Sequence, residues 1–302
     1  MAKRAAKISD AARAFMAAAE NAPPPPPDMT MQDRRRETRA ACTKASKEAV
    51  IRHKVVLRDV EIGDVPCLRV IPPEVIPNRM VLYIFGGGFT TGSPFEDLPI
   101  ISALAAHLKA PVICPEYRLA PEHPFPAALD DVEAVARVLL AGTDKLAIAG
   151  ESAGGNLALA LDQRLRRKKE RRADALATLS PATDMGDTGD SGLANRDPLL
   201  KQARVTEVNA AYCPNRDLSD PEISPIYGTY GPDTPPTIIT TGTRDLFLSN
   251  CVRQERVMRE ANAQVVLRVW EGMGHVFEYY PDIPEAEASL GEIAAFLEPH
   301  LS

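Results

Sequence analysis

Apolar and polar residues alternate along this chain in blocks whose lengths predict strands and helices in turn. The run at 80–84, MVLYI, is apolar throughout, which is typical of a strand buried on both faces of a parallel sheet. From this run to the C-terminus, helical and strand patterns follow one another, apart from one irregular interval. Helices are predicted at 97–108, 127–140, 155–168, 248–261 and 284–297, and strands at 112–114, 145–149, 175–179, 237–241 and 265–269.

This order of elements predicts an α/β fold. Because a strand–helix–strand connection places its two strands parallel, we expect a mostly parallel sheet of about eight strands with helices on both faces. Two more strands, at 55–60 and 65–71, flank the turn Ile62-Gly63-Asp64 and predict a hairpin. Ligands of such sheets bind at the carboxyl ends of the strands, so the residues that follow each strand are candidates for a site.

Two segments lie outside this alternation and predict a cap. Before the first strand, helical patterns at 9–20 and 31–51 are joined by five prolines, 23–27, which would form an extended spacer. The irregular interval, rich in Asp, Gly and Pro, has the length of a lid or functional loop. The alternative for the N-terminal part is a disordered arm, because low hydrophobicity also permits disorder. We divide the chain into an N-terminal helical cap segment, 1–52, and a catalytic domain, 53–302, with a cap insertion at about 183–230.

The charge of the chain bears on which kinds of partner it would bind. The 302 residues are 45% hydrophobic and 25% charged, which fits a globular protein with a large core. The formal net charge of −6 does not favour a nucleic acid or an anionic membrane as partner. The basic run at 164–172, RLRRKKERR, falls at the end of a predicted helix, where cations complement the helix dipole, so we expect a solvated helix end. Arg34, Arg35, Arg36 and Arg39 are also expected to be solvated.

The five cysteines indicate a reducing compartment. They are scattered and lack C-x-x-C spacing, which favours neither a zinc site nor a disulfide framework. Asp10, Arg13 and Glu20 interrupt the N-terminal segment before it could serve as a signal peptide, and no apolar run reaches the ~20 residues of a membrane span. We therefore expect a cytoplasmic protein without a membrane span.

A nucleophile is predicted at Ser152, in the sequence Gly150-Glu151-Ser152-Ala153-Gly154. This G-x-S-x-G pattern stands between a strand and a helix, where a sharp turn exposes the serine hydroxyl and the glycines avoid collisions. The helix that follows places a backbone N–H of Ala153 and a positive dipole end near the attacked carbonyl. The alternative is a glycine-rich turn that only packs a helix on a sheet.

Two further candidates follow later strands. Asp245 comes just after the strand at 237–241, and His275 lies in a glycine-rich loop after the strand at 265–269. The chain order Ser, Asp, His is that of α/β-hydrolases, in which the histidine moves the serine proton and the aspartate orients the imidazole. A helix N-cap is the alternative for Asp245, and an ordinary loop histidine is the alternative for His275. Of the five histidines, however, only His275 follows a late core strand.

The glycine run Phe85-Gly86-Gly87-Gly88-Phe89 directly follows the strand at 80–84. Three glycines allow the backbone to direct its N–H groups at a developing oxyanion, together with the N–H of Ala153. A phosphate-binding loop is the competing interpretation. No Lys-Ser/Thr pair follows the glycines, and Thr91 occupies the place of the third glycine of a G-x-G-x-x-G motif.

From about Val55 onward, the sequence resembles the bacterial hormone-sensitive-lipase-like family of α/β-hydrolases, and most of all its esterases and lactone hydrolases. The resemblance rests on five segments: FGGGF (85–89), EYRLAPEHPFPAALDD (116–131), GESAGG (150–155), GTRDLF (242–247) and GMGHVF (272–277).

The resemblance implies a cofactor-free, metal-free serine carboxylesterase that hydrolyses short-chain carboxylic esters or lactones through an acyl-enzyme. It implies a helical cap and often a homodimer. It also selects Gly87 and Gly88, with Ala153, as donors of the oxyanion hole, and Phe85 and Phe89 are expected to contact the substrate.

One residue departs from the family pattern, because Phe85 stands where the family usually has a histidine that orients the glycine loop. Phenylalanine can pack but cannot donate a hydrogen bond, so we expect apolar contacts to hold this loop. The departure leaves a second functional hypothesis open, in which a catalytically weak relative of the same fold binds a small apolar ligand in the capped pocket.

Overall fold

A computed structural model describes residues 7–22, 29–194 and 196–302, so the predicted proline spacer at 23–27 lies outside the described residues. One eight-stranded sheet runs through the molecule in the order β1-β2-β4-β3-β5-β6-β7-β8. β1 and β2 form the predicted hairpin, β2 is also antiparallel to β4, and all other neighbours are parallel. The predicted, mostly parallel sheet is therefore confirmed. The strands are β1 (Val56–Ile62), β2 (Val65–Ile71), β3 (Arg79–Ile84), β4 (Val112–Pro115), β5 (Lys145–Glu151), β6 (Ala175–Leu179), β7 (Thr237–Gly242) and β8 (Val265–Trp270).

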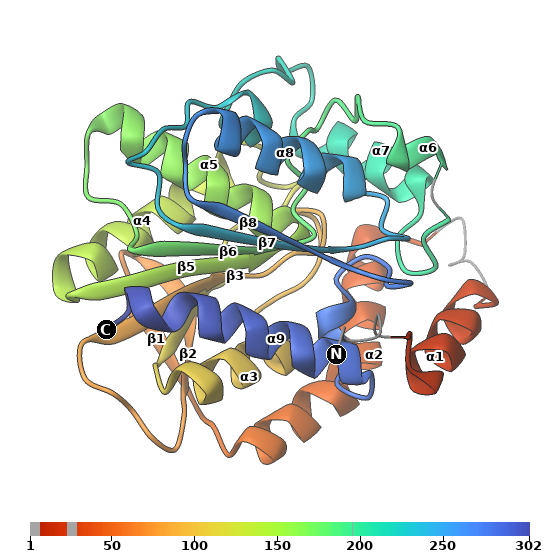
Figure 1. Cartoon of the computed structure of the whole chain (residues 1–302), viewed down its shortest axis with the longest axis horizontal. Coiled ribbons are helices and arrows are strands. Elements are labelled where there is room, and N and C mark those ends of the chain that lie inside the picture. Colours follow the sequence, from red (N-terminus) through yellow and green to blue (C-terminus); the bar gives the residue numbers. More distant parts are fainter. Residues whose placement is uncertain (1–6, 23–28, 195) are drawn as a thin grey trace, which may run out of the picture.

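Helices cover both faces of the sheet, as Figure 1 shows. One face carries α4 (Ala127–Gly142), α5 (Ser152–Lys168) and α8 (Leu248–Glu260), and the other carries α3 (Leu98–Leu108) and α9 (Pro284–Leu297). Because both faces are covered, the central strands are buried along most of their length, and every residue of β6 is buried. This is why β3 and β6 read as continuous apolar runs and not as alternating ones.

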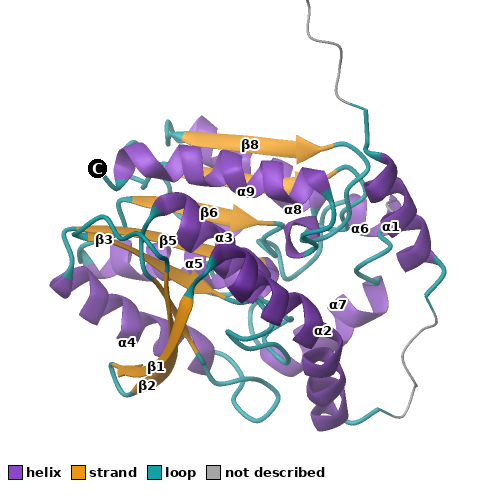
Figure 2. Cartoon of the chain, turned by 90° about the horizontal axis from the view of Figure 1, so that it is seen from below, coloured by secondary structure: helices purple, strands orange, loops and turns teal. Residues whose placement is uncertain are grey.

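The remaining helices gather at the carboxyl ends of the parallel strands, and Figures 1 and 2 agree on this placement. They come from the N-terminal segment, as α1 (Asp10–Glu20) and α2 (Met31–His53), and from the irregular interval, as α6 (Ser191–Ala194) and α7 (Gln202–Tyr212). Ala12 and Met16 of α1 pack in a separate hydrophobic cluster with Met273 and Phe277, which flank His275. Among the described residues, no helix is both long and apolar enough to cross a membrane.

The sequence had led us to expect that the arginines of α2 are solvated. This expectation is wrong for Arg35 and Arg39. Arg35 donates to the backbone oxygens of Thr90 (2.8 Å) and Ala120 (2.9 Å) and pairs with Glu122 (2.7 Å). Arg39 stacks over the ring of Phe95, 4.2 Å from its centroid. A charged helix can thus be a packing helix, because guanidinium groups bind backbone oxygens and aromatic faces of a neighbouring loop.

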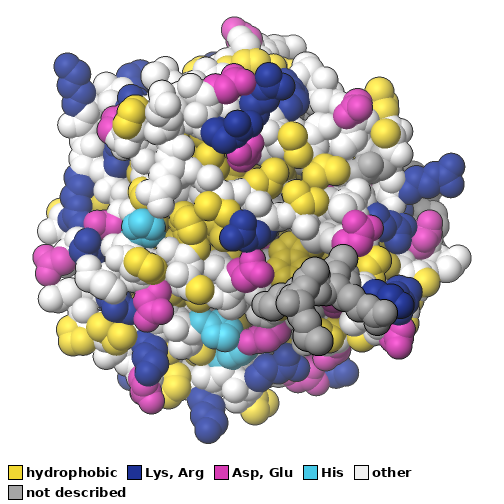
Figure 3. Space-filling model, in the orientation of Figure 1, with side chains coloured by type: hydrophobic (Ala, Val, Ile, Leu, Met, Phe, Trp, Pro, Cys, Tyr) yellow, Lys and Arg dark blue, Asp and Glu magenta, His cyan; other side chains and the backbone are white. Residues whose placement is uncertain are grey.

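The basic run at 164–172 is also not simply a solvated helix end. The Arg164 side chain is only 7% exposed and forms ion pairs with Glu222 (2.5 Å), Glu133 (3.0 Å) and Asp130 (2.6 Å). These carboxylates belong to α4 and to the segment after α7, so no local sequence pattern predicted the ion pairs. On the face shown in Figure 3, Lys and Arg side chains are interspersed with Asp and Glu side chains.

Replacing Arg164 with leucine should lower the free energy of unfolding by about 3 kcal/mol, because Glu133 and Glu222 would be left buried without this counterion. Denaturant titration at neutral pH measures the effect. The control is Arg166→Met on the same helix, because Arg166 pairs with Asp233, whose side chain is 64% exposed. That variant should lose less than about 1 kcal/mol. Equal losses in the two variants would contradict the role given to Arg164.

Candidate active site

Ser152 lies at a sharp turn between β5, which ends at Glu151, and α5, which begins at Ser152. Its φ of +51° is a left-handed conformation that a non-glycine residue adopts at a cost in strain. The two glycines of the motif make the turn possible. A Cβ on Gly150 would lie 2.5 Å from the oxygen of Gly154, and a Cβ on Gly154 would lie 1.9 Å from the oxygen of Ile84.

Of the three residues predicted from strand ends, His275 lies within hydrogen-bond distance of both Ser152 and Asp245. The Nε2 of His275 is 2.9 Å from the Oγ of Ser152, and its Nδ1 is 3.0 Å from the Oδ1 of Asp245. Asp245 is fully buried and also accepts hydrogen bonds from the Phe247 N–H (2.8 Å) and the Thr241 hydroxyl (2.9 Å). The N-cap residue of α8 is Phe247, so Asp245 is not the helix cap of the alternative interpretation.

The charges around His275 favour its protonated form. Burial by itself would lower the pKa of His275, but the carboxylates of Asp245, Asp197 and Glu151 outweigh it and raise the pKa to about 9. The pKa of Asp245 is lowered despite its burial, because His275 provides an opposite charge and a hydrogen bond. The arrangement therefore stabilises an imidazolium, which is the form that His275 takes after accepting a proton from Ser152.

Asp197 is a site residue that the sequence did not reveal. Its side chain accepts hydrogen bonds from the backbone N–H groups of His275 (3.0 Å), Leu246 (3.2 Å) and Leu199 (2.8 Å). One buried carboxylate thus joins the loops that carry His275 and Asp245 to the segment before α7. The only local signal was an Asp-Pro pair in an interval rich in aspartate, which by itself predicts a turn.

The carboxylates of Asp197 and Asp245 and the imidazole of His275 also form the one group among the described residues with the spacing of a metal site. Both nitrogens of His275 and both oxygens of Asp197 already take part in the hydrogen bonds given above. The hydrogen bonds of His275 suit proton transfer from Ser152.

The glycine loop requires glycine at both positions named for the oxyanion hole. Gly87 and Gly88 have φ values of +92° and +64°. A Cβ on Gly87 would lie 2.3 Å from the oxygen of Thr91, and a Cβ on Gly88 would lie 2.7 Å from the Cγ2 of Val208. The N–H and the hydroxyl of Thr91 both donate to the oxygen of Gly87 (3.1 and 2.8 Å), which fixes the turn of the loop.

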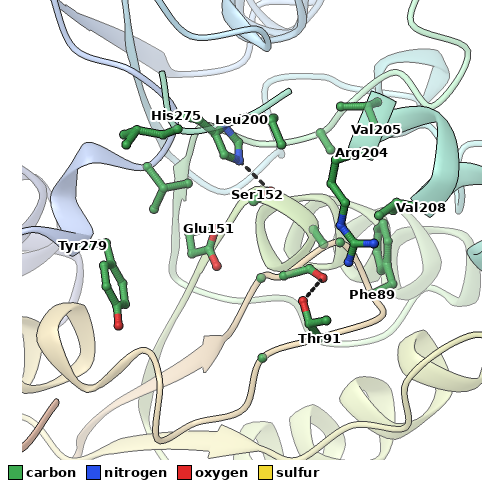
Figure 4. Close-up of a pocket in the computed structure, with 18 of the residues that line it drawn as sticks. Phe89, Thr91, Glu151, Ser152, Leu200, Arg204, Val205, Val208, His275 and Tyr279 are labelled. Carbon is green, nitrogen blue, oxygen red and sulfur yellow. Dashed lines mark hydrogen bonds between the residues drawn. The ribbon is translucent and has the colours of Figure 1, made fainter. Parts of the chain in front are cut away.

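A cavity of about 340 Å³ opens above Ser152, and Gly87, Gly88, Ala153 and His275 line it. Figure 4 shows the hydrogen bond between His275 and Ser152 in this cavity. Further lining residues come from α2, from α7 and from the segment before α7, and include Thr38, Cys42, Leu199, Leu200, Val205 and Val208.

The structure treats the two phenylalanines of the glycine run differently. Phe89 lines the cavity and stacks on Tyr212, with ring centroids 3.6 Å apart. Phe85, which we expected to contact the substrate, does not line the cavity. It is 1% exposed and stacks on Tyr117 at 4.1 Å, because its side chain points into the core at the end of β3. The Tyr117 hydroxyl donates to the backbone oxygen of Phe85 (2.9 Å), so stacking on Tyr117 and this hydrogen bond fix the start of the loop.

Acidic side chains also contribute to the lining of the cavity. Glu96, Asp97 and Glu151 line it, and burial raises the pKa of Glu151 to about 7. Burial and the charge of Glu151 also raise the pKa of Asp97, whose carboxyl oxygen accepts a hydrogen bond from the Tyr83 hydroxyl (3.0 Å). A Cβ on Gly86 would lie 1.9 Å from an oxygen of Glu151, so this carboxyl group lies directly against the glycine loop.

Comparison with known proteins places this geometry in a family. Residues 81–279 match a protein family whose description is "alpha/beta hydrolase fold". A putative acetyl-hydrolase of Mycobacterium tuberculosis, LipR, is 32% identical over 247 residues, which are 80% of this chain and 80% of that protein. An ethyl acetate hydrolase of Pseudomonas putida is 31% identical over 76% of this chain and 77% of its own length.

The structural comparison agrees with the sequence comparison. The crystal structure of a hormone-sensitive lipase from a metagenome library superposes with a TM-score of 0.87 at 31% identity, covering 98% of this chain and 100% of the other. The matched region exceeds half of the chain, and the resemblance noted in the sequence is confirmed. The chain belongs to the α/β-hydrolase family, in its hormone-sensitive-lipase-like branch.

Proposed function

We propose that this protein is a serine carboxylesterase that hydrolyses short-chain esters through an acyl-enzyme on Ser152. The observation that carries the proposal is the continuous hydrogen-bonded series Ser152–His275–Asp245 at the floor of the cavity. The names of relatives, an acetyl-hydrolase and an ethyl acetate hydrolase, support small acyl groups. A cavity of about 340 Å³ fits the same substrate range.

Acylation begins when the Oγ of Ser152 forms a bond to the ester carbonyl carbon while the Nε2 of His275 takes the hydroxyl proton. The carbonyl oxygen becomes an oxyanion, and the N–H groups of Gly87, Gly88 and Ala153 donate to it. The bond to the alcohol oxygen then breaks, and this oxygen leaves with the proton of His275. Asp245 keeps the imidazole oriented and stabilises its cation.

Deacylation repeats the same steps with water as the nucleophile. Water attacks the acyl carbon as its proton moves to His275, and the bond between the acyl carbon and Ser152 Oγ breaks as that oxygen recovers a proton. The products are one carboxylic acid and one alcohol. No cofactor enters this balance.

We also propose that residues 1–52 and 183–230 act as a cap over the catalytic domain, 53–302. Support comes from the lining of the cavity, to which α2 contributes Cys42 and α7 contributes Val205 and Val208. Lactone hydrolysis, a homodimer and a cytoplasmic location stay predictions. For the last of these, support comes from the five cysteines, all of them free thiols. The alternative, a catalytically weak relative that binds a small apolar ligand, was based on Phe85. None of the contacts of Phe85 given above favours that alternative.

Replacing Ser152 or His275 with alanine should each lower kcat by roughly 10⁴-fold or more, and the double variant should be little worse, because the residues act as one unit. Release of p-nitrophenol from p-nitrophenyl butyrate measures the rate. Wild-type kcat in His275→Ala would refute the assignment of the base.

Replacing Gly87 or Gly88 with alanine should lower kcat/KM by about 100-fold, which corresponds to about 3 kcal/mol of lost oxyanion stabilisation. The control is Gly291→Ala in α9, where an added Cβ meets no atom within 4 Å. That variant should keep wild-type kinetics. A loss of less than about threefold at both loop positions would mean that the oxyanion donors lie elsewhere.

The dependence of kcat/KM on pH should reflect His275. The base must be neutral to accept a proton and its pKa is raised to about 9, so activity should rise with pH and level off only above that value. Asp197→Asn removes one of the carboxylates that raise this pKa, and should shift the rise toward lower pH by roughly one unit. A midpoint near the ordinary histidine value in both proteins would contradict this electrostatic account.

A further inference from the structure

Arg204 is the only Lys or Arg side chain among the described residues that line the catalytic cavity. It projects from α7 between Val205 and Val208, and its side chain is only 20% exposed. Burial lowers the pKa of Arg204, which reflects the cost of placing a guanidinium in an apolar wall. A buried charge in a binding cavity calls for a partner of opposite charge.

Within the protein, the positive charge of Arg204 is only partly neutralised. Nη2 of Arg204 donates to the hydroxyl of Thr90 (2.7 Å), and Nη1 lies 3.1 Å from a carboxylate oxygen of Glu207. Glu207 is 43% exposed and is shared with Arg34, whose Nη2 lies 3.6 Å from its other oxygen. The contact with Glu207 is the only polar contact of Nη1 of Arg204 in the described part of the chain, and Nε of Arg34 is buried there without a hydrogen bond. Two guanidinium groups thus share one partly solvated carboxylate, which leaves an excess positive charge.

This charge lies beside the reacting centre. Arg204 and Val208 are one helical turn apart, and Val208 is the side chain that a Cβ on Gly88 would strike. Figure 4 shows the guanidinium directed from α7 toward the glycine loop, near Phe89 and Thr91, and on a different side of Ser152 from His275. His275 must protonate the leaving alcohol oxygen, so the alcohol part of an ester faces His275. The acyl part then extends toward α7 and Arg204.

Acidic groups elsewhere in the lining strengthen the selection. Glu96, Asp97 and Glu151 also line the cavity, so an anionic group placed beside them would meet carboxyl groups and not a cation. A negative charge within the cavity is therefore directed to Arg204. Guanidinium groups bind carboxylates in a planar, often bidentate arrangement, and such charge-assisted hydrogen bonds are strong where water is excluded.

We propose that the preferred substrates are esters whose acyl chain ends in a carboxylate, that is, monoesters of short dicarboxylic acids, and that Arg204 determines this specificity. The proposal rests on the esterase function proposed above. Hydrolysis follows the same steps, with an acyl-enzyme whose free carboxylate pairs with Arg204, and it releases a dicarboxylate and an alcohol.

The test compares kcat/KM for monoethyl glutarate and ethyl pentanoate, which differ only by a carboxylate in place of the terminal methyl group. In Arg204→Met, the ratio of the anionic to the neutral ester should fall at least about tenfold, as expected for loss of a charged hydrogen bond. In Arg204→Lys, this ratio should fall less than in Arg204→Met. Glu207→Gln removes the competing carboxylate and should raise the ratio. The control is Arg268→Met, an arginine of β8 that is 51% exposed, which should leave both values unchanged.

A second pair, 4-acetoxybutanoate and butyl acetate, carries the same difference on the alcohol side. If the ratio of this pair, and not that of the first, depends on Arg204, the placement of the acyl chain is wrong and the proposal falls. Unchanged ratios in Arg204→Met and Glu207→Gln, with wild-type protein active on neutral esters, would overturn the specificity and leave the esterase function standing. Failure of the wild-type protein to hydrolyse any ester, p-nitrophenyl butyrate included, would reject both.

Discussion

The close approach of α5 to the ends of β3 and β5 is the constraint on which the rest of the site depends. Gly150 and Gly154 allow backbone contacts that no side chain would permit, and Gly154 lies directly against the oxygen of Ile84. This contact holds Ser152 in its left-handed conformation. It also places the start of α5 beside the glycine loop, because that loop continues from Ile84. The nucleophile and the proposed oxyanion donors are therefore parts of one packed unit.

A second level of organisation is electrostatic. His275 is surrounded by carboxyl groups, and they stabilise its cation strongly enough to outweigh burial. Asp197 contributes to this field and also fixes the backbone of His275 and Leu246, so the same side chain influences both the geometry and the proton affinity of the base. Behind the His275 loop, α1 packs Ala12 and Met16 against Met273 and Phe277. Segments outside the sheet thus support the base.

Among the described residues, the lining of the cavity combines acidic groups with a single arginine, Arg204. The sheet and its turns hold the reacting groups, whereas α2, α7 and the segment before α7 shape the space around them. These capping elements are joined to the loops at the strand ends by long-range contacts, such as those of Arg35 with the backbone oxygens of Thr90 and Ala120. The shape of the cavity therefore depends mainly on these capping elements, whereas the reaction chemistry depends on the strand ends together with Asp197.

The sequence by itself determined whatever depends on local pattern. The apolar runs predicted the sheet, and the strand–turn–helix at Gly150 to Gly154 predicted the nucleophile; the residues after two later strands predicted Asp245 and His275, because parallel strands end at one edge. Only the tertiary structure decided the roles of Asp197, Arg164 and Arg204, whose partners lie in distant segments. It also turned Phe85 away from the cavity and onto Tyr117. The physical reason is that a charged or aromatic side chain carries no periodic signal of its partner, and its environment is set by segments that meet only when the sheet has formed.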